Sequence, residues 1–261
     1  MFRSNAFNRR DFLTLAAAAA TVLVTPTSGA HALPAGRGKI RAIAFDAFTT
    51  FDPRPLNALA EQMFPGNGAA LMNAWRTRQF EYTWLRTITN RYLDFWHVTE
   101  DALVFAAKLV KLDLSTEQRD QFMQAFLAIK AWPDALPALR KMKESGLRLA
   151  FLANPTAKML DTWVANAGLE GVFETHLSTD RVRAFKPDTR AYQMGVDAFG
   201  MRRKEILFAA FGGWDAAGAK AFGYPTFWVN RGAAPSEELG IAPDGVGATL
   251  TDLEQFVASR T

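Results

Sequence analysis

A single aspartate ends a short apolar run near the front of the chain, at Ile40–Asp46. The run has the near-continuous apolar character of a buried parallel strand. Ligands of open α/β sheets bind just beyond the carboxyl ends of such strands, so a carboxylate at that point lies where reactions take place. Aspartate is also a favoured N-cap residue, and Asp46 could instead do no more than begin a helix.

Three further polar groups stand at comparable places in the sequence. Asn154 follows the apolar run 147–152, Asp215 follows the run 206–211, and Lys186 lies in a loop expected at the same sheet edge. Convergence of groups from distant parts of the chain indicates a site better than any one residue does. Each has a structural alternative, since Lys186 could lie in an exposed turn and Asp215 could cap the helix that follows it.

The elements that would position these groups alternate along the chain. From residue 133 onward, apolar runs alternate with amphipathic stretches that begin at cap residues and end at glycine. We expect strands at 40–45, 147–152, 175–178, 206–211 and 226–230, and helices at 134–145, 156–167, 188–199, 214–222 and 251–259. This alternation predicts an α/β fold, a Rossmann-like doubly wound parallel sheet with right-handed crossovers.

Residues 55–131 have a different character, with many aromatic side chains at helical spacing, as at Phe80 and Trp84. Ser115 and Gln118 have the spacing of a capping box. We expect about four helices here, forming a helical cap inserted into an α/β core of residues 39–54 and 132–256. Most of these aromatic side chains are expected to serve ordinary packing.

Composition excludes several functions. The chain has no cysteine, which excludes disulfides, thiol catalysis and thiolate metal sites. Its formal net charge is +4, and removal of residues 1–32, with three arginines and one aspartate, leaves +2. A balance this weak gives no electrostatic reason to expect binding to nucleic acid.

The first thirty-two residues resemble an export signal. Residues 8–14 resemble the twin-arginine motif, residues 13–24 form a mild apolar stretch, and Ala30 to Ala32 fit a cleavage site. The apolar stretch is too short to span about 30 Å of hydrocarbon as a membrane anchor. We therefore expect cleavage after Ala32 and export, by the Tat (twin-arginine) machinery, of a folded protein to a periplasm.

Four motifs together resemble those of the haloacid dehalogenase superfamily: Phe45–Asp46, the strand ending in Asn154, Lys186–Pro187 and Gly212–Asp215. The chain is most similar to the L-2-haloacid dehalogenase branch, and the resemblance covers essentially all of 39–256. Further stretches resembling that branch are 81–86, 90–92, 99–103, 186–188, 214–219 and 222–231.

The resemblance implies that Asp46 attacks C2 of a 2-substituted carboxylic acid, and that water then hydrolyses the resulting ester. It implies that Lys186 keeps Asp46 ionised and that Thr50 hydrogen-bonds the nucleophile. Tyr192 matches a tyrosine near the lysine, and Asp215 matches an acid that positions Lys186 and water.

The resemblance also implies a substrate pocket. Arg76 and Asn154 match positions that hold the leaving halide, where a positive charge and amide donors stabilise negative charge. Phe80, Phe95 and Trp214 would wall the pocket and exclude water. Arg76 could otherwise belong to a solvated helix face.

Several positions depart from the family patterns. The related phosphatases use a second acid two residues after the nucleophile and another acid to bind magnesium, and the corresponding residues here are Phe48 and Phe211. Rings at both positions remove hard-cation ligands, so we expect no phosphatase activity, no metal and no cofactor. Ala153 replaces a serine that helps bind the substrate carboxylate, which backbone N–H groups at Ala47 and Phe48 could still hold.

Three further positions depart from the branch itself. Thr49 replaces a glycine, while Ala210 and Gly212 replace a serine and an asparagine near the hydrolytic water. Each lost hydrogen bond is worth roughly 0.5–1.5 kcal/mol. Ester hydrolysis is therefore the step that these substitutions affect most.

Three functions follow from these observations. The first is hydrolytic dehalogenation of a short 2-haloalkanoic acid to a 2-hydroxy acid and halide. The second applies the same mechanism to azetidine-2-carboxylate or another 2-substituted carboxylate. The third is a catalytically impaired periplasmic protein that binds a carboxylate. The resemblance also suggests a homodimer formed through the cap helices.

Overall fold

The computed structural model describes residues 39–260, and the predicted export signal at 1–32 lies outside them. A six-stranded sheet has the order β5-β4-β1-β6-β7-β8, and every neighbouring pair is parallel. Its strands are β1 (Ala42–Phe45), β4 (Arg148–Ala153), β5 (His176–Ser178), β6 (Ile206–Ala210), β7 (Thr226–Val229) and β8 (Gly245–Gly247). The α/β fold class with its parallel sheet is confirmed.

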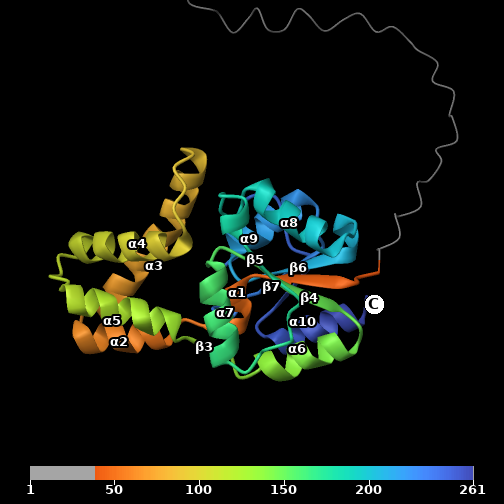
Figure 1. Ribbon diagram of the computed structural model, residues 1–261, viewed down its shortest axis with the longest axis horizontal. Coiled ribbons are helices and arrows are strands. Elements are labelled where there is room, and N and C mark those ends of the chain that lie inside the picture. Colours follow the sequence, from red (N-terminus) through yellow and green to blue (C-terminus); the bar gives the residue numbers. More distant parts are fainter. Residues whose placement is uncertain (1–38, 261) are drawn as a thin grey trace, which may run out of the picture. The chain divides into compact units, whose positions relative to one another are not determined.

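Helices cover both faces of this sheet (Figure 1). One face packs on α6 (Ala135–Glu144), α7 (Ala157–Asn166) and α10 (Leu250–Ala258), and the other on α8 (Thr189–Phe199) and α9 (Gly213–Phe222). Side chains alternate between the faces, because Phe45 and Phe151 belong to the first cluster and Ala44 and Leu152 to the second. Two 3₁₀ turns, η1 (Thr179–Arg181) and η2 (Arg203–Glu205), complete this part of the chain.

Four helices form an insertion between two short strands. These strands, β2 (Phe51–Asp52) and β3 (Lys130–Ala131), pair antiparallel and carry the chain into and out of the insertion. The helical insertion consists of α2 (Pro55–Met63), α3 (Gly68–Ile88), α4 (Phe95–Leu109) and α5 (Thr116–Leu127). Helix α5 begins with the predicted capping box of Ser115 and Gln118.

Buried hydrogen bonds join α3 to α4 inside the insertion. The Trp75 indole donates to the Thr99 carbonyl at 2.8 Å, and the Gln79 amide donates to the Thr99 hydroxyl at 2.7 Å. Among the described residues, no helix is both long and apolar enough to cross a membrane.

Three local features were not predicted from the sequence. The segment after Gly232 contains β8, which was missed because it carries only one apolar side chain. Asp46 is followed by the single helical turn α1 (Ala47–Thr50) and by β2. Asp134 precedes α6 but makes no side-chain cap; its carboxylate binds Arg231 and the Leu250 N–H instead.

Candidate active site

Asp46 lies at the carboxyl edge of the sheet, immediately after β1. Its Oδ1 accepts a hydrogen bond from the Phe48 N–H at 2.8 Å, and its Oδ2 accepts one from Lys186 Nζ at 2.6 Å. Its own N–H donates to the Ala209 carbonyl on β6. Both interpretations of the sequence therefore describe this residue, because Asp46 caps α1 and faces the polar groups at the sheet edge.

Lys186 is completely buried between two carboxylates. Its Nζ lies 2.6 Å from Asp46 Oδ2 and 2.5 Å from Asp215 Oδ2. Burial by itself lowers the pKa of Lys186, but the charges and hydrogen bonds of Asp215 and Asp46 outweigh burial and raise it. The lysine therefore remains charged and supplies the positive charge that both acids need in this dry environment.

Asp215 lies in the first turn of α9 and is also fully buried. Its Oδ1 accepts a hydrogen bond from the Tyr192 hydroxyl at 2.6 Å. Burial raises the pKa of Asp215 to about 6, although Lys186 opposes this effect. The Tyr192 hydroxyl stays protonated, because burial and the nearby Asp215 raise its pKa well above the ordinary value.

Asn154 follows β4 and holds the lysine segment in place. Its Oδ1 accepts a hydrogen bond from the backbone N–H of Lys186 at 3.1 Å, and only 5% of the residue is exposed. The adjacent Ala153 is buried at the end of the strand, as is Ala47 at the start of α1. The sheet edge thus brings together Asp46, Asn154, Lys186 and Asp215, groups that are distant in sequence.

Within the described residues, the Thr50 hydroxyl makes no hydrogen bond to the Asp46 carboxylate. Its hydroxyl lies 3.5 Å from that of Thr49, and the Thr49 hydroxyl donates to the backbone carbonyl of Asp46 at 2.7 Å. The predicted hydrogen bond from Thr50 to the Asp46 carboxylate is therefore replaced by a contact of its neighbour with the main chain.

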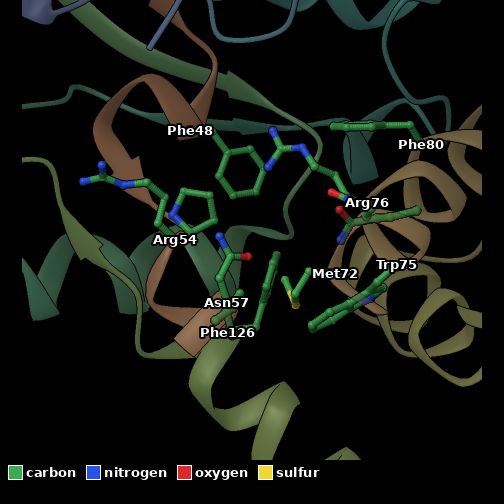
Figure 2. A pocket seen from close by; sticks show the side chains of 12 residues that line it. Phe48, Arg54, Asn57, Met72, Trp75, Arg76, Phe80 and Phe126 are labelled. Atoms are coloured by element: carbon green, nitrogen blue, oxygen red, sulfur yellow. The ribbon is translucent and has the colours of Figure 1, made fainter. Parts of the chain in front are cut away.

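Arg76, on α3, lies at a cavity between the insertion and the core. Arg76 and Phe48 both line this cavity of about 160 Å³ (Figure 2). The guanidinium carbon also lies 5.3 Å from the Phe211 ring centroid and 5.7 Å from that of Phe80. Arg76 forms no ion pair with a residue that the structure describes. It is exposed to the cavity, but the surrounding protein atoms lower its pKa, and the charge of Asp46 opposes this.

Two of the predicted wall residues, Phe80 and Trp214, meet across the insertion and the core. Their ring centroids lie 5.2 Å apart in an edge-to-face arrangement. Both residues and Arg76 line a second cavity of about 400 Å³. Phe95 takes a different place: it is buried at the start of α4 and packs on Phe185, next to the lysine.

Aromatic rings, those of Phe48 and Phe211, occupy the two positions at which the resemblance places acidic residues in the related phosphatases. Phe48 packs on Phe126, Trp163 and Phe211 at centroid distances of 5.8–6.3 Å. Within residues 39–260, no group of three or more histidine or acidic side chains is arranged to hold a metal ion.

Two functional candidates escaped the analysis of the sequence, Trp132 and Arg231. Both donate hydrogen bonds to backbone carbonyls of α1, the turn that carries Asp46. The only sequence signal was their position, since Trp132 begins the core after the insertion and Arg231 follows β7.

Comparisons with known proteins agree with this geometry. A family model described as haloacid dehalogenase-like hydrolase matches residues 25–223. The chain is 41% identical to an (S)-2-haloacid dehalogenase of Pseudomonas sp. (strain YL) over 206 residues, 78% of this chain and 89% of the relative.

Solved structures give the same result. A crystal structure of an L-2-haloacid dehalogenase is 41% identical with a TM-score of 0.83, covering 84% of this chain and 99% of that one. The Xanthobacter autotrophicus L-2-haloacid dehalogenase, solved with chloropropionic acid covalently bound, is 32% identical. Its TM-score is 0.76, and the match covers 85% of this chain and 100% of that one.

Proposed function

Because this chain belongs to the haloacid dehalogenase-like hydrolase family, we propose that it hydrolyses short 2-haloalkanoic acids through an ester on Asp46. The products are a 2-hydroxy acid and a halide ion. The observation that carries this proposal is the buried Lys186, whose Nζ contacts both Asp46 and Asp215. The solved relative that holds chloropropionic acid covalently bound supports a covalent intermediate.

In the first step, an oxygen of Asp46 attacks C2 of the substrate and the carbon–halogen bond breaks, with the electron pair leaving on the halide. The Phe48 N–H and Lys186 Nζ hold the two carboxylate oxygens, so the nucleophile is oriented before the substrate arrives. Arg76 is the nearby cation for the departing halide. Phe80 and Trp214 limit access of water.

Ester formation changes the charge around the lysine. Once Asp46 is esterified it is neutral, and Lys186 retains a single counter-charge in Asp215. In the second step, water attacks the carboxyl carbon of Asp46 and the ester C–O bond at that carbon breaks. This step releases the 2-hydroxy acid and a proton and restores the Asp46 carboxylate. We assign the positioning of Lys186 and of this water to Asp215. Asn154, which accepts the backbone N–H of Lys186, is assigned with Arg76 to the departing halide.

We also propose that the reaction uses no metal ion. The rings of Phe48 and Phe211 support this proposal, since they stand where the related phosphatases have acids. Halide release should therefore continue undiminished in the presence of a chelator.

The test is a product assay on a panel of 2-substituted carboxylates with a chelator present. The wild-type chain should release halide from 2-chloropropionate, and Asp46→Asn should lose this activity. Asp120→Asn, which changes an exposed aspartate on α5, is the matched control and should retain it. Full turnover by Asp46→Asn would refute the mechanism. Turnover of azetidine-2-carboxylate and of no 2-haloacid would mean that the leaving group is the ring amine and not a halide.

We further propose export and a cap arrangement. The arginine pair at Arg9 and Arg10 supports export to a periplasm by the Tat machinery. Residues 55–131 would act as a cap over a core of 39–54 and 132–256.

A homodimer through the insertion is also proposed. Ile88 is 81% exposed at the end of α3, and Leu85 and Leu93 beside it are 52% and 42% exposed. Apolar side chains of this size gathered on one helical hairpin are a suitable contact for a second copy. Sedimentation should give a dimer for the wild-type chain and a monomer for Ile88→Glu.

A further inference from the structure

Asp46 depends on a very short helix for its geometry. Helix α1 contains only Ala47–Thr50, and the Phe48 N–H that it presents to Asp46 is 2.8 Å from Oδ1. A single helical turn is not stable on its own, and the last carbonyl groups of a helix need partners from outside it. The position of the nucleophile therefore depends on whatever binds those carbonyls.

Two residues from outside the turn bind them. Trp132 Nε1 donates to the Phe48 carbonyl at 3.1 Å, and the Trp132 backbone N–H donates to the Thr50 carbonyl at 2.9 Å. Arg231 Nη2 donates to the Thr49 carbonyl, between these two, at 2.8 Å. Three consecutive carbonyls of the nucleophile turn are thus held by two residues.

Both residues are themselves fixed. The two terminal nitrogens of Arg231 each lie 3.0 Å from an oxygen of Asp134, a bidentate pair, and the arginine side chain is only 7% exposed. Its guanidinium lies 4.4 Å from the ring centroid of Trp132, which is itself 7% exposed. Asp134 also accepts a hydrogen bond from the Leu250 N–H. The donors therefore have little freedom to move.

We infer that Trp132 and Arg231 are positioning residues that hold Asp46 at the angle and depth from which it attacks the substrate. Both residues also line the cavity of about 400 Å³ to which Arg76 belongs. The role inferred for them acts through the backbone carbonyls of α1. This inference rests on the proposed function, because it assigns the two residues to the step in which Asp46 forms the ester. A displacement of about 1 Å at a reacting group can cost on the order of 100-fold in rate.

The test compares kcat and KM for halide release in four variants of the full chain. Trp132→Phe keeps an aromatic ring, although a smaller one, and the backbone N–H, but removes Nε1–H. Arg231→Met removes the donor to Thr49, and Arg231→Lys keeps one donor and the charge facing Asp134. Arg203→Met is the matched control, since Arg203 also stacks on a ring, that of Phe222, and donates to its carbonyl.

The control lies at the opposite edge of the sheet, because Arg203 precedes the amino end of β6 whereas Asp46 follows the carboxyl end of β1. We expect kcat to fall about 10-fold in Trp132→Phe and further in Arg231→Met, with KM nearly unchanged. Arg231→Lys should recover part of the loss, and Arg203→Met should match the wild type in kcat.

Three results are decisive against the inference. The first is that an active wild type, Trp132→Phe and Arg231→Met have the same kcat per folded molecule. Both residues would then have only a structural role, even if the variants melt at lower temperatures. A loss confined to KM would overturn the inference too. Absence of halide release by the wild-type chain would instead reject the proposed function, and the inference with it.

Discussion

Lys186 balances two buried acids, and this balance connects the two proposed halves of the reaction. Before ester formation it faces Asp46 and Asp215 together; afterwards it faces Asp215 alone. An isolated buried charge is strongly unfavourable, so Asp215 keeps the lysine paired when Asp46 becomes neutral. The Tyr192 hydroxyl completes the arrangement by donating to the other oxygen of Asp215.

The raised pKa of Asp215 gives a prediction for pH. Burial raises this pKa to about 6, so the group is ionised above that value and gains a proton below it. Protonation removes a counter-charge of Lys186, and kcat/KM, which reports the ionisation of the free enzyme, should therefore fall as the pH drops through about 6. A pH profile of kcat/KM for halide release measures this effect.

Asp215→Asn provides the check, because asparagine cannot titrate. Its residual activity should be far lower than that of the wild type and should show no acidic limb near pH 6. An unchanged acidic limb in Asp215→Asn would assign that titration to another group.

At the scale of elements, the site depends on the strands that deliver its residues to one edge. Strand β1 lies between β4 and β6, and the register pairs Phe45 with Phe151 and with Ala209. Asp46 and Asn154 consequently emerge at the same edge of the sheet. The rings beneath this edge stack closely, with Phe151 and Phe173 at a centroid distance of 3.9 Å.

Removing one of these rings should destabilise the sheet beneath the site. Phe151 is fully buried, and Phe151→Ala should lower the free energy of unfolding by about 3–5 kcal/mol, because it leaves a cavity. Leu239→Ala, at a residue that is 62% exposed, should change it by less than about 0.5 kcal/mol. Urea denaturation measures both, and similar values for the two variants would contradict this packing.

The strands that the sequence predicted well are those with uninterrupted apolar runs. Residues 42–45 and 206–210 are wholly buried, so their patterns directly reflect a sheet covered on both faces. Strand β8 has two glycines and one exposed valine, and its pairing with β7 depends on tertiary contact that no local pattern reveals.

The same limit applies to the site. The convergence of Asp46, Lys186 and Asp215 could be predicted, because the topology of a parallel sheet brings strand ends together. The partners of α1 could not, since Arg231 reaches Thr49 across 182 positions in the sequence. The hydrogen-bond partner of the Thr50 hydroxyl likewise depends on side-chain geometry within one turn, and a sequence motif does not determine that geometry.

At the scale of the whole molecule, the proposed export signal would carry an already folded protein, with its site formed, to a periplasm. The chain has no cysteine, so stability after export would depend on packing and not on disulfides. Replacing Arg9 and Arg10 together by lysine should prevent export, because the signal is recognised through its arginine pair. Fractionation of cells that produce each form measures this, and equal periplasmic amounts would exclude the Tat route.

The most direct test of the central claim follows oxygen atoms through one turnover. If Asp46 forms the new bond to C2, the hydroxyl oxygen of the first product comes from Asp46, and water supplies its replacement. With enzyme in excess over 2-chloropropionate in H₂¹⁸O, mass spectrometry should find ¹⁸O in the Asp46 carboxylate and unlabelled 2-hydroxy acid. Label in the product's hydroxyl group, with none in Asp46, would mean that water attacks the substrate directly and would contradict the account.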